Sequence, residues 1–344
     1  MTLFDHKKHG ILQAGVGALF AVFFCGHALA DPYGRFNILE ENDSLYFKTD
    51  KHYTQGIRLS YLSPSILTGD AFDRPFDYLG AISPIFSAAA DDRRYAWLFG
   101  QSIFTPENLQ LRPPNSRDRP YAGWLYGGLS LLQHDGDGTL ENLELDLGVV
   151  GPGALGKEVQ NDWHQFIGIK QAQGWSDQLQ NEPGGVLTYQ RLWRLRIAGG
   201  DSFGIDAVPE AGATVGNVFD FGELGGMLRI GSGLGADYGP ARVRPALSGT
   251  DYFDSSRVGD GFGGYFYIGT QGRVVARNIF LDGNSFRQSP SVEHKVLVGD
   301  VEGGFAFFWS RRVRADFSVT QRTEEFVGQR TPDVIGTAAL SFSL

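Results

Sequence analysis

The strongest constraint on the fold is a series of segments, each about ten residues long, in which apolar and polar side chains alternate. Residues 142–149 are the clearest case: Leu143, Leu145, Leu147 and Val149 alternate with Asn142, Glu144, Asp146 and Gly148. A period of two places the two sets on opposite faces of a β-strand. After Asp31 no apolar run reaches the length of a membrane-spanning helix, which is about 20 residues. The chain is therefore expected to be all-β.

We predict twelve strands, at residues 36–47, 53–63, 94–104, 121–132, 140–150, 186–198, 203–215, 222–232, 262–277, 295–309, 312–323 and 333–344. A secreted sandwich is one way to assemble them, but it would bury Asp300 and Glu302 in a dry core at high cost. A membrane barrel has a polar lumen that accepts them. The sequence favours a twelve-stranded antiparallel transmembrane β-barrel with a helical extracellular loop.

Composition narrows the class of protein further. The chain has 47 glycines, 26 Phe, 13 Tyr and 6 Trp, with only 20% charged residues and a formal net charge of −9. So many aromatic residues at so low a charge exclude a disordered chain. An acidic chain without a basic stripe is not expected to bind nucleic acid.

The first thirty residues have the pattern of a secretory signal peptide. A short basic start precedes an apolar run at 11–25, and Ala28-Leu29-Ala30 matches the small-x-small cleavage pattern. We predict a signal peptide at 1–30 and one outer-membrane barrel domain at 31–344; an uncleaved anchor is the alternative. Cleavage would remove Cys25, the single cysteine, and with it thiol nucleophiles, disulfides and thiolate metal sites.

With both termini on the periplasmic side, the odd-numbered connections face the outside of the cell: 48–52, 105–120, 151–185, 216–221, 278–294 and 324–332. One of them contains a predicted helix at 156–170, with Val159, Trp163, Phe166 and Ile167 at helical spacing. Such a helix is expected to contact the outer leaflet. The connection 64–92 is long for a periplasmic turn, and the sequence assigns it no role.

Gln160 and His164 lie four residues apart on that helix and therefore share a face. Two interpretations of His164 stay open at this point: an interfacial side chain without a task, or a general base that activates water or a hydroxyl. No Gly-x-Ser-x-Gly and no His-Glu-x-x-His motif occurs in the sequence.

Oxygen-bearing side chains gather where the first two strands meet. Asn42 and Asp43 lie near the end of the first strand, and Thr54 lies near the start of the second. Hard oxygen donors of this kind suit calcium. Strand neighbours face opposite sides, so Asn42 and Asp43 can serve together only through a bulge or a backbone carbonyl. The alternative is that Asn-Asp only turns the hairpin.

Six short pieces of this sequence, in this order, resemble the outer-membrane lipid A 3'-O-deacylase family. They span residues 41–179: Glu41–Asp43, Thr49–Gly56, Asp118–Gly123, Gly151–Pro152, Glu158–His164 and Gly174–Leu179.

The resemblance implies a calcium-dependent esterase that removes the 3'-linked acyloxyacyl group from lipid A (lipopolysaccharide) in the outer leaflet. It implies that His164 is the general base, with Gln160, Thr54 and Asn42 as further catalytic residues. Asp43 and Asn42 would hold the calcium ion. The active site would lie at the extracellular end, between the barrel wall and the helical loop.

Two departures from the family pattern concern the substrate. Lys170 stands where an acidic residue is expected, and the basic pair that engages phosphate has no clear match, with Arg112 or Arg117 as the candidates. Two alternatives follow: a phospholipase A-like outer-membrane esterase, or a pore or structural barrel without catalysis. The sequence leaves the oligomeric state open.

Overall fold

The structure is a computed structural model that describes residues 34–43, 50–66, 69–83, 85–86, 90, 92–136, 138–200, 202–243, 250–258 and 261–343. Three predictions lie outside these residues: the signal peptide at 1–30, the end of the first strand at 44–47, and Leu344 at the end of the last strand.

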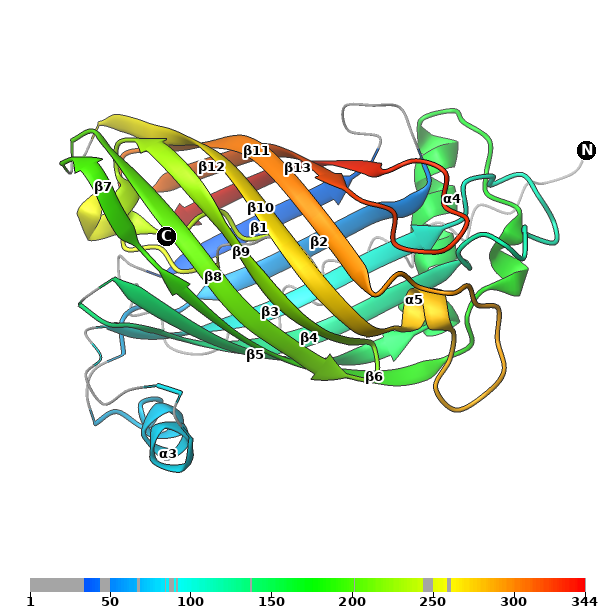
Figure 1. The fold of residues 1–344 in the computed structure, drawn as a ribbon, viewed down its shortest axis with the longest axis horizontal. Coiled ribbons are helices and arrows are strands. Elements are labelled where there is room, and N and C mark those ends of the chain that lie inside the picture. Colours follow the sequence, from blue (N-terminus) through cyan, green and yellow to red (C-terminus); the bar gives the residue numbers. More distant parts are fainter. Residues whose placement is uncertain are drawn as a thin grey trace, which may run out of the picture. The chain divides into compact units, whose positions relative to one another are not determined.

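The described residues form one antiparallel sheet (Figure 1). Its strands are β1 (Arg35–Asn42), β2 (His52–Leu62), β3 (Asp92–Thr105), β4 (Ala122–His134), β5 (Thr139–Val150), β6 (Glu182–Trp193), β7 (Leu195–Gly199), β8 (Gly204–Gly216), β9 (Phe219–Gly231), β10 (Phe262–Asn278), β11 (Leu297–Trp309), β12 (Val313–Arg322) and β13 (Asp333–Ser343).

The sheet closes into a barrel because β6 pairs with β8 and β1 pairs with β13. The short strand β7 follows β6 after Arg194 and pairs only with the start of β8. The wall therefore has the twelve strands that the sequence predicts. The predicted strand 186–198 is divided into β6 and β7, since Arg194 interrupts the pairing.

The predicted alternation is confirmed along the wall. On β5, Leu145 and Leu147 are 44% and 59% exposed, whereas Glu144 and Asp146 are buried. On β11, Val301 and Phe305 are exposed, whereas Asp300, Glu302 and Ala306 on the other face are buried. Apolar side chains thus cover the outside and charged ones line the inside, which excludes the sandwich.

Ion pairs neutralise the charges inside the barrel. Asp300 contacts Arg273 (2.9 Å) and Arg322 (2.9 Å), which come from the two strands next to its own. Glu302 contacts Arg242 at 2.7 Å. A carboxylate in a low-dielectric interior needs such partners.

Arg242 belongs to the connection between β9 and β10, which folds into the lumen. Its guanidinium also contacts Glu41 on β1 and donates to Thr320 Oγ1 on β12 at 2.6 Å. Further along the connection, Phe253 packs against Phe308 on β11, with 5.6 Å between ring centroids. Contacts with strands on several sides show that this segment occupies the interior, which argues against an open pore.

Three α-helices lie in the described connections: α3 (Arg74–Ile82), α4 (Gly156–Phe166) and α5 (Ile279–Asp282). Helices α4 and α5 lie at one end of the barrel and α3 at the other (Figure 1). The described residues also contain short 3-10 helices, namely η1 (Pro152–Ala154), η2 (Gly174–Asp177), η3 (Leu234–Ala236) and η4 (Ser255–Arg257). No helix in the described part of the chain is long and apolar enough to span a membrane.

Strand direction places the six predicted outer connections at the α4 end: 43–51, 106–121, 151–181, 217–218, 279–296 and 323–332. The helix predicted at 156–170 is confirmed but ends at Phe166. Gly168 has a φ of +75°, a left-handed conformation that terminates helices, so the chain turns back before Lys170.

Candidate functional site

Helix α4 rests on the outer face of the barrel wall. Its N-terminus packs directly on Gly123 of β4, where an added Cβ would lie 3.0 Å from Ala154 Cβ and 3.3 Å from Gly156 N. Beside this contact, Gln101 of β3 donates from Nε2 to the Ala154 carbonyl at 2.6 Å. Only glycine at position 123 allows an approach this close.

The polar face of α4 points toward the wall, and the apolar residues point away from it. Gln160 and His164 are buried, while Trp163, Phe166 and Ile167 are 52%, 80% and 46% exposed. In a water-soluble protein the apolar face would be the buried one. This orientation fits a helix whose outer side contacts lipid.

The ring of His164 is held on both nitrogens. Nδ1 lies 2.8 Å from the Lys170 carbonyl, which can only accept, so Nδ1 carries a hydrogen and donates it. Nε2 lies 2.8 Å from Asp50 Oδ2. An unprotonated ring nitrogen and a carboxylate oxygen are both hydrogen-bond acceptors. At this distance they need a proton between them, so His164 and Asp50 share one.

Asp50 lies in the connection between β1 and β2 and is the centre of the cluster. Besides His164, it accepts a hydrogen bond from Gln160 Nε2 at 3.1 Å. Burial raises the pKa of Asp50, and the neighbouring His164, Thr54 and Gln160, which lower it, offset this only in part. We assigned no role to Asp50 from the sequence, although it belongs to the Thr49–Gly56 piece that resembles the deacylase family.

A buried tryptophan fixes the orientation of Gln160. Trp175 Nε1 donates to Gln160 Oε1 at 2.8 Å, which leaves the Gln160 amide nitrogen to face Asp50. Trp175 in turn packs on Tyr121, with ring centroids 4.9 Å apart. The Gly174–Leu179 piece of the family pattern therefore contributes the tryptophan that orients Gln160.

Thr54 enters the site through a β-bulge. The pairing of β2 with β3 shifts register between Tyr53 and Gln55, which leaves Thr54 as the extra residue. Its hydroxyl bonds to Thr105 Oγ1 at 2.7 Å and to the Asp50 carboxylate. The bulge lies on β2. From the sequence we expected a bulge or a backbone carbonyl at Asn42 and Asp43, so that both residues could act as calcium ligands.

Asp43 and Asn42 face different surroundings. Asp43 is buried and its Oδ2 accepts from the Lys51 backbone N–H at 2.6 Å, one residue away from Asp50. Asn42 pairs in regular register with Gln55, and both side chains bond to the Glu40 carboxylate. Asp43 is thus linked to the His164 cluster by its bond to Lys51, the residue after Asp50. Asn42 instead lies beside the Glu40 carboxylate.

The donor atoms around Lys51 have the chemistry that calcium requires. Asp43 and Asp50 supply carboxylate oxygens on either side of it, and Thr54 adds a hydroxyl. No group of three or more His, Cys, Asp or Glu in the described residues could hold a metal ion. A calcium ion here would therefore complete its shell with neutral oxygens and water.

The basic residues singled out in the sequence lie at the same end of the barrel. Lys170 is exposed, and it contacts His164 through its backbone carbonyl. Arg112 and Arg117 are exposed in the connection 106–121, which packs against the segment after α4 through a bond from Gln173 N to the Leu109 carbonyl (2.8 Å).

Two of the other histidines are buried. His52 Nδ1 is 2.7 Å from Asp333 Oδ1, and His134 stacks on Tyr252 with 5.5 Å between ring centroids. His134 packs against the connection that folds into the lumen, whereas His52 lies at the outer end of the wall, where it also contacts Asp118 at 3.7 Å and Phe326.

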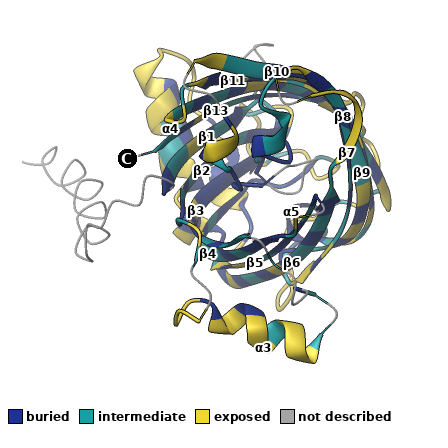
Figure 2. Cartoon of the chain, turned by 90° about the vertical axis from the view of Figure 1, so that its left-hand side faces the viewer, coloured by how far each residue is buried: buried dark blue, intermediate teal, exposed yellow. Residues whose placement is uncertain are grey.

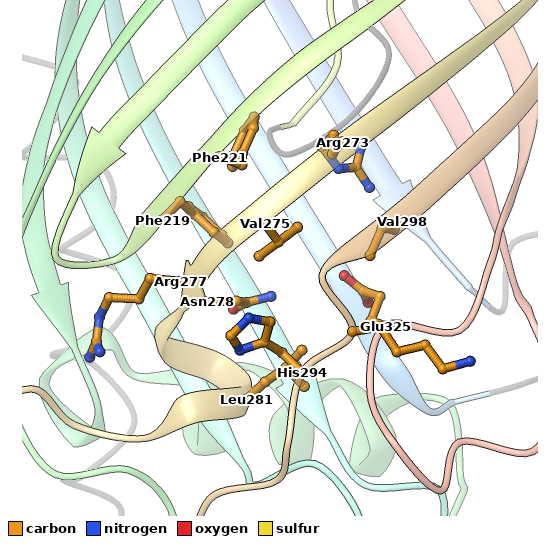
Figure 3. A pocket seen from close by; sticks show the side chains of 11 residues that line it. Phe219, Phe221, Arg273, Val275, Arg277, Asn278, Leu281, His294, Val298 and Glu325 are labelled. Atoms are coloured by element: carbon orange, nitrogen blue, oxygen red, sulfur yellow. The ribbon is translucent and has the colours of Figure 1, made fainter.

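His294 lies in a pocket on the inner face of the wall, near α5 (Figure 3). Its Nδ1 is 2.5 Å from Asp282 Oδ1. The pocket is lined by apolar side chains such as Phe219 and Phe221 together with charged ones such as Arg273 and Glu325. None of its lining residues carries a hydroxyl or thiol, and it is separate from the His164 cluster.

Comparison with known proteins gives one family. The family described as "Outer membrane protein LpxR" matches residues 15–344. No curated protein matches the chain.

Among solved structures, LpxR from Salmonella typhimurium superposes with a TM-score of 0.72 at 20% identity, covering 90% of this chain and 100% of that one. This similarity establishes the shared fold. The β domain of the Bordetella autotransporter BrkA has a TM-score of 0.40 at 10% identity, covering 90% and 98%. The translocator domain of NalP from Neisseria meningitidis has 0.35 at 8%, covering 97% and 95%. Scores this low carry no argument beyond a general likeness between barrels.

Proposed function

Because the chain belongs to the LpxR family of outer-membrane proteins, we propose that it is a lipid A deacylase that hydrolyses the 3'-linked acyloxyacyl ester. The observation that carries the proposal is the contact of His164 with Asp50, located on the lipid-facing side of the wall beneath α4. The buried His52 and His134 have carboxylate or aromatic partners too, but neither lies on α4 beside its exposed apolar side chains.

The location suits an ester inside a membrane. The outer side of α4 is apolar, where the exposed Trp163 and Phe166 pack on one another with 5.6 Å between ring centroids. Acyl chains of an outer-leaflet lipid can lie along this surface while the ester reaches His164. The substrate would not have to leave the membrane.

The protein residues support general-base hydrolysis. The Lys170 carbonyl holds the hydrogen on His164 Nδ1, so Nε2 is the nitrogen that can take a proton. The proton shared by Nε2 and Asp50 must first leave to solvent, and the carboxylate must withdraw from the ring, so that water can enter between them. Thr54 and Gln160, which bond to the same carboxylate, can then orient the water.

In the proposed reaction, water is consumed and the ester is split into an alcohol and an acid. Nε2 takes a proton from water, whose oxygen bonds to the ester carbonyl carbon. The tetrahedral intermediate then releases the sugar 3'-oxygen, which receives the proton from His164. The products are a free sugar hydroxyl and the acyloxyacyl acid, and the Asp50 carboxylate stabilises the imidazolium between the two steps.

Calcium is part of the proposal. Asp43, with Asn42 or backbone oxygens, would hold the ion, and Asp50 is a second carboxylate close by. When bound, calcium would supply positive charge for the developing oxyanion. Arg112 and Arg117 are the proposed contacts for lipid A phosphate groups.

The filled lumen favours an enzyme over a pore. Arg242 and Phe253 contact β12 and β11 from inside, and Asp237 of the same connection contacts Arg229 on β9, so an open channel would require this connection to leave the barrel.

Mass spectrometry of lipid A from cells with and without the protein tests the proposal. We expect loss of the 3'-acyloxyacyl mass with the native protein and with Gln165→Ala, an exposed neighbour on α4, but not with His164→Ala. Heat-dependent gel mobility would verify that each variant forms a barrel. Hydrolysis of phospholipid with unchanged lipid A would contradict the proposal and favour the phospholipase alternative.

A further inference from the structure

Helix α3 lies outside the barrel wall at the end opposite α4 (Figures 1 and 2). Arg93 attaches it to β3: its Nη1 is 2.7 Å from Asp73 Oδ1 and 2.7 Å from Asp77 Oδ1. Its Nε donates to Gln133 on β4 at 2.9 Å. Arg93 lies on the same face of β3 as Tyr95 and Trp97, so α3 is held on the outward side.

The segment after α3 completes this attachment. Phe76 packs on Phe86 with 5.1 Å between ring centroids, and both side chains are buried. The Phe86 backbone N–H donates to Glu141 Oε2 on β5 at 3.0 Å. Contacts with Arg93 on β3 and Glu141 on β5 therefore hold the helix and the segment after it against the wall.

Much of the apolar surface of α3 nevertheless remains uncovered. Phe72, Tyr78 and Ile82 are 55%, 67% and 63% exposed. Tyr78 and Ile82 are four residues apart and share a face, and that face differs from the one on which Asp73 and Asp77 meet Arg93. A contiguous exposed apolar surface marks an interaction site.

Phe72, just before the N-cap of α3, extends the aromatic side chains of the lipid-facing wall to the start of the helix. Phe72 stacks on Tyr95 with ring centroids 5.2 Å apart, and Tyr95 meets Trp97 at 6.4 Å. Trp97 and Phe99 continue along β3 and are 47% and 43% exposed. Tyrosine and tryptophan in such a row are typical of the boundary between membrane and water.

We propose that α3 is an interfacial helix whose Tyr78 and Ile82 side chains, together with Phe72 just before it, insert into the phospholipid leaflet on the periplasmic side of the outer membrane. Continuity with the wall favours lipid over a soluble partner, because the row from Phe72 to Trp97 already lies at the membrane boundary. The polar face with Asp77 would remain in water. This role is independent of the deacylase proposal, and it accounts for the length of the connection 64–92.

Site-specific fluorescence tests the insertion. In the full chain with Cys25→Ser, a bimane label is attached at Ile82→Cys, or at the adjacent Ala81→Cys, which points to a different side of the helix. The protein is reconstituted in phosphatidylethanolamine–phosphatidylglycerol vesicles with and without brominated lipid. We expect brominated lipid to quench the label at 82 and aqueous iodide to quench the label at 81.

Two outcomes would overturn the proposal. Equal quenching of both labels by iodide, with no effect of brominated lipid, would place α3 in water. Protection of the label at 82 that rises with protein concentration and ignores brominated lipid would indicate a second copy of the chain. Tyr78→Cys gives an independent label on the same face, and heat-dependent gel mobility confirms that each labelled protein is a folded barrel.

Discussion

His164 Nε2 lies 2.8 Å from Asp50 Oδ2, which joins helix α4 to the connection between β1 and β2 across the outer face of the barrel. Because the Lys170 carbonyl fixes the hydrogen on Nδ1, proton transfer to and from His164 takes place at Nε2, the nitrogen that faces Asp50. The pair identifies Asp50 as a residue whose replacement should affect turnover.

We expect Asp50→Asn to lower the rate of deacylation while the barrel remains folded. The amide cannot stabilise the imidazolium as a carboxylate does, and general-base catalysis contributes about 10²–10⁴-fold to a rate. The loss should therefore lie within that range and appear in kcat. Asp162→Asn, an exposed carboxyl on the same helix, is the matched control. Full activity of Asp50→Asn would remove Asp50 from the mechanism.

Removal of calcium should abolish turnover and its return should restore it. A chelator with calcium affinity far above that of magnesium is added to purified protein, and deacylation of lipid A is measured before and after calcium is supplied. Asp43→Asn should need more calcium for the same rate, since one carboxylate ligand is lost. Turnover that is undiminished in the chelator would show that no metal is needed.

Arg242→Ala should destabilise the barrel strongly. Glu41 and Glu302, both buried, would each lose a cation, and breaking a buried pair costs roughly 3–5 kcal/mol. The midpoint of urea unfolding, followed by tryptophan fluorescence, should fall, whereas the exposed Arg287→Ala should leave it unchanged. An unchanged midpoint for Arg242→Ala would mean that the connection is not part of the packed lumen.

The attachment of α3 should weaken in acid. The Arg93 guanidinium and the Gly69 backbone N–H hold the pKa of Asp73 below its usual range. A carboxyl with a lowered pKa in the folded state stabilises it at pH values above its unfolded pKa. That contribution disappears as the pH falls through the folded pKa.

Anisotropy of the label at Ala81→Cys measures this attachment. It should be high at neutral pH and drop at a pH below the usual range of aspartate. Asp73→Asn should show the lower value already at neutral pH, while the exposed Asp70→Asn keeps the native profile. An identical pH profile in Asp73→Asn would exclude Asp73 as the group that titrates.

The barrel could be predicted from the sequence because alternation is a local property of each strand. Leu145 is exposed and Glu144 is buried because successive residues of a strand point to opposite faces, and this alternation is visible in the sequence. The break at Arg194 escaped prediction, since the apolar pattern continues through it and only the pairing of β7 with β8 reveals it.

The site was predictable only in part. Helical spacing placed Gln160 and His164 on one face, but it could not tell whether that face or the apolar one meets the wall. Asp50 becomes recognisable only when α4 and the β1–β2 connection are in contact. The role of Arg242 in the lumen could not be predicted either, because its partners Glu41 and Glu302 lie far away in the sequence.

The most direct test is the rate at which purified protein releases the 3'-acyloxyacyl acid from lipid A, with His164→Ala and Gln165→Ala compared under the same calcium concentration. A loss of about 10²–10⁴-fold in His164→Ala, with Gln165→Ala close to the native rate, is the predicted result. Release by a folded His164→Ala barrel at the native rate would contradict the assignment of His164 as the base.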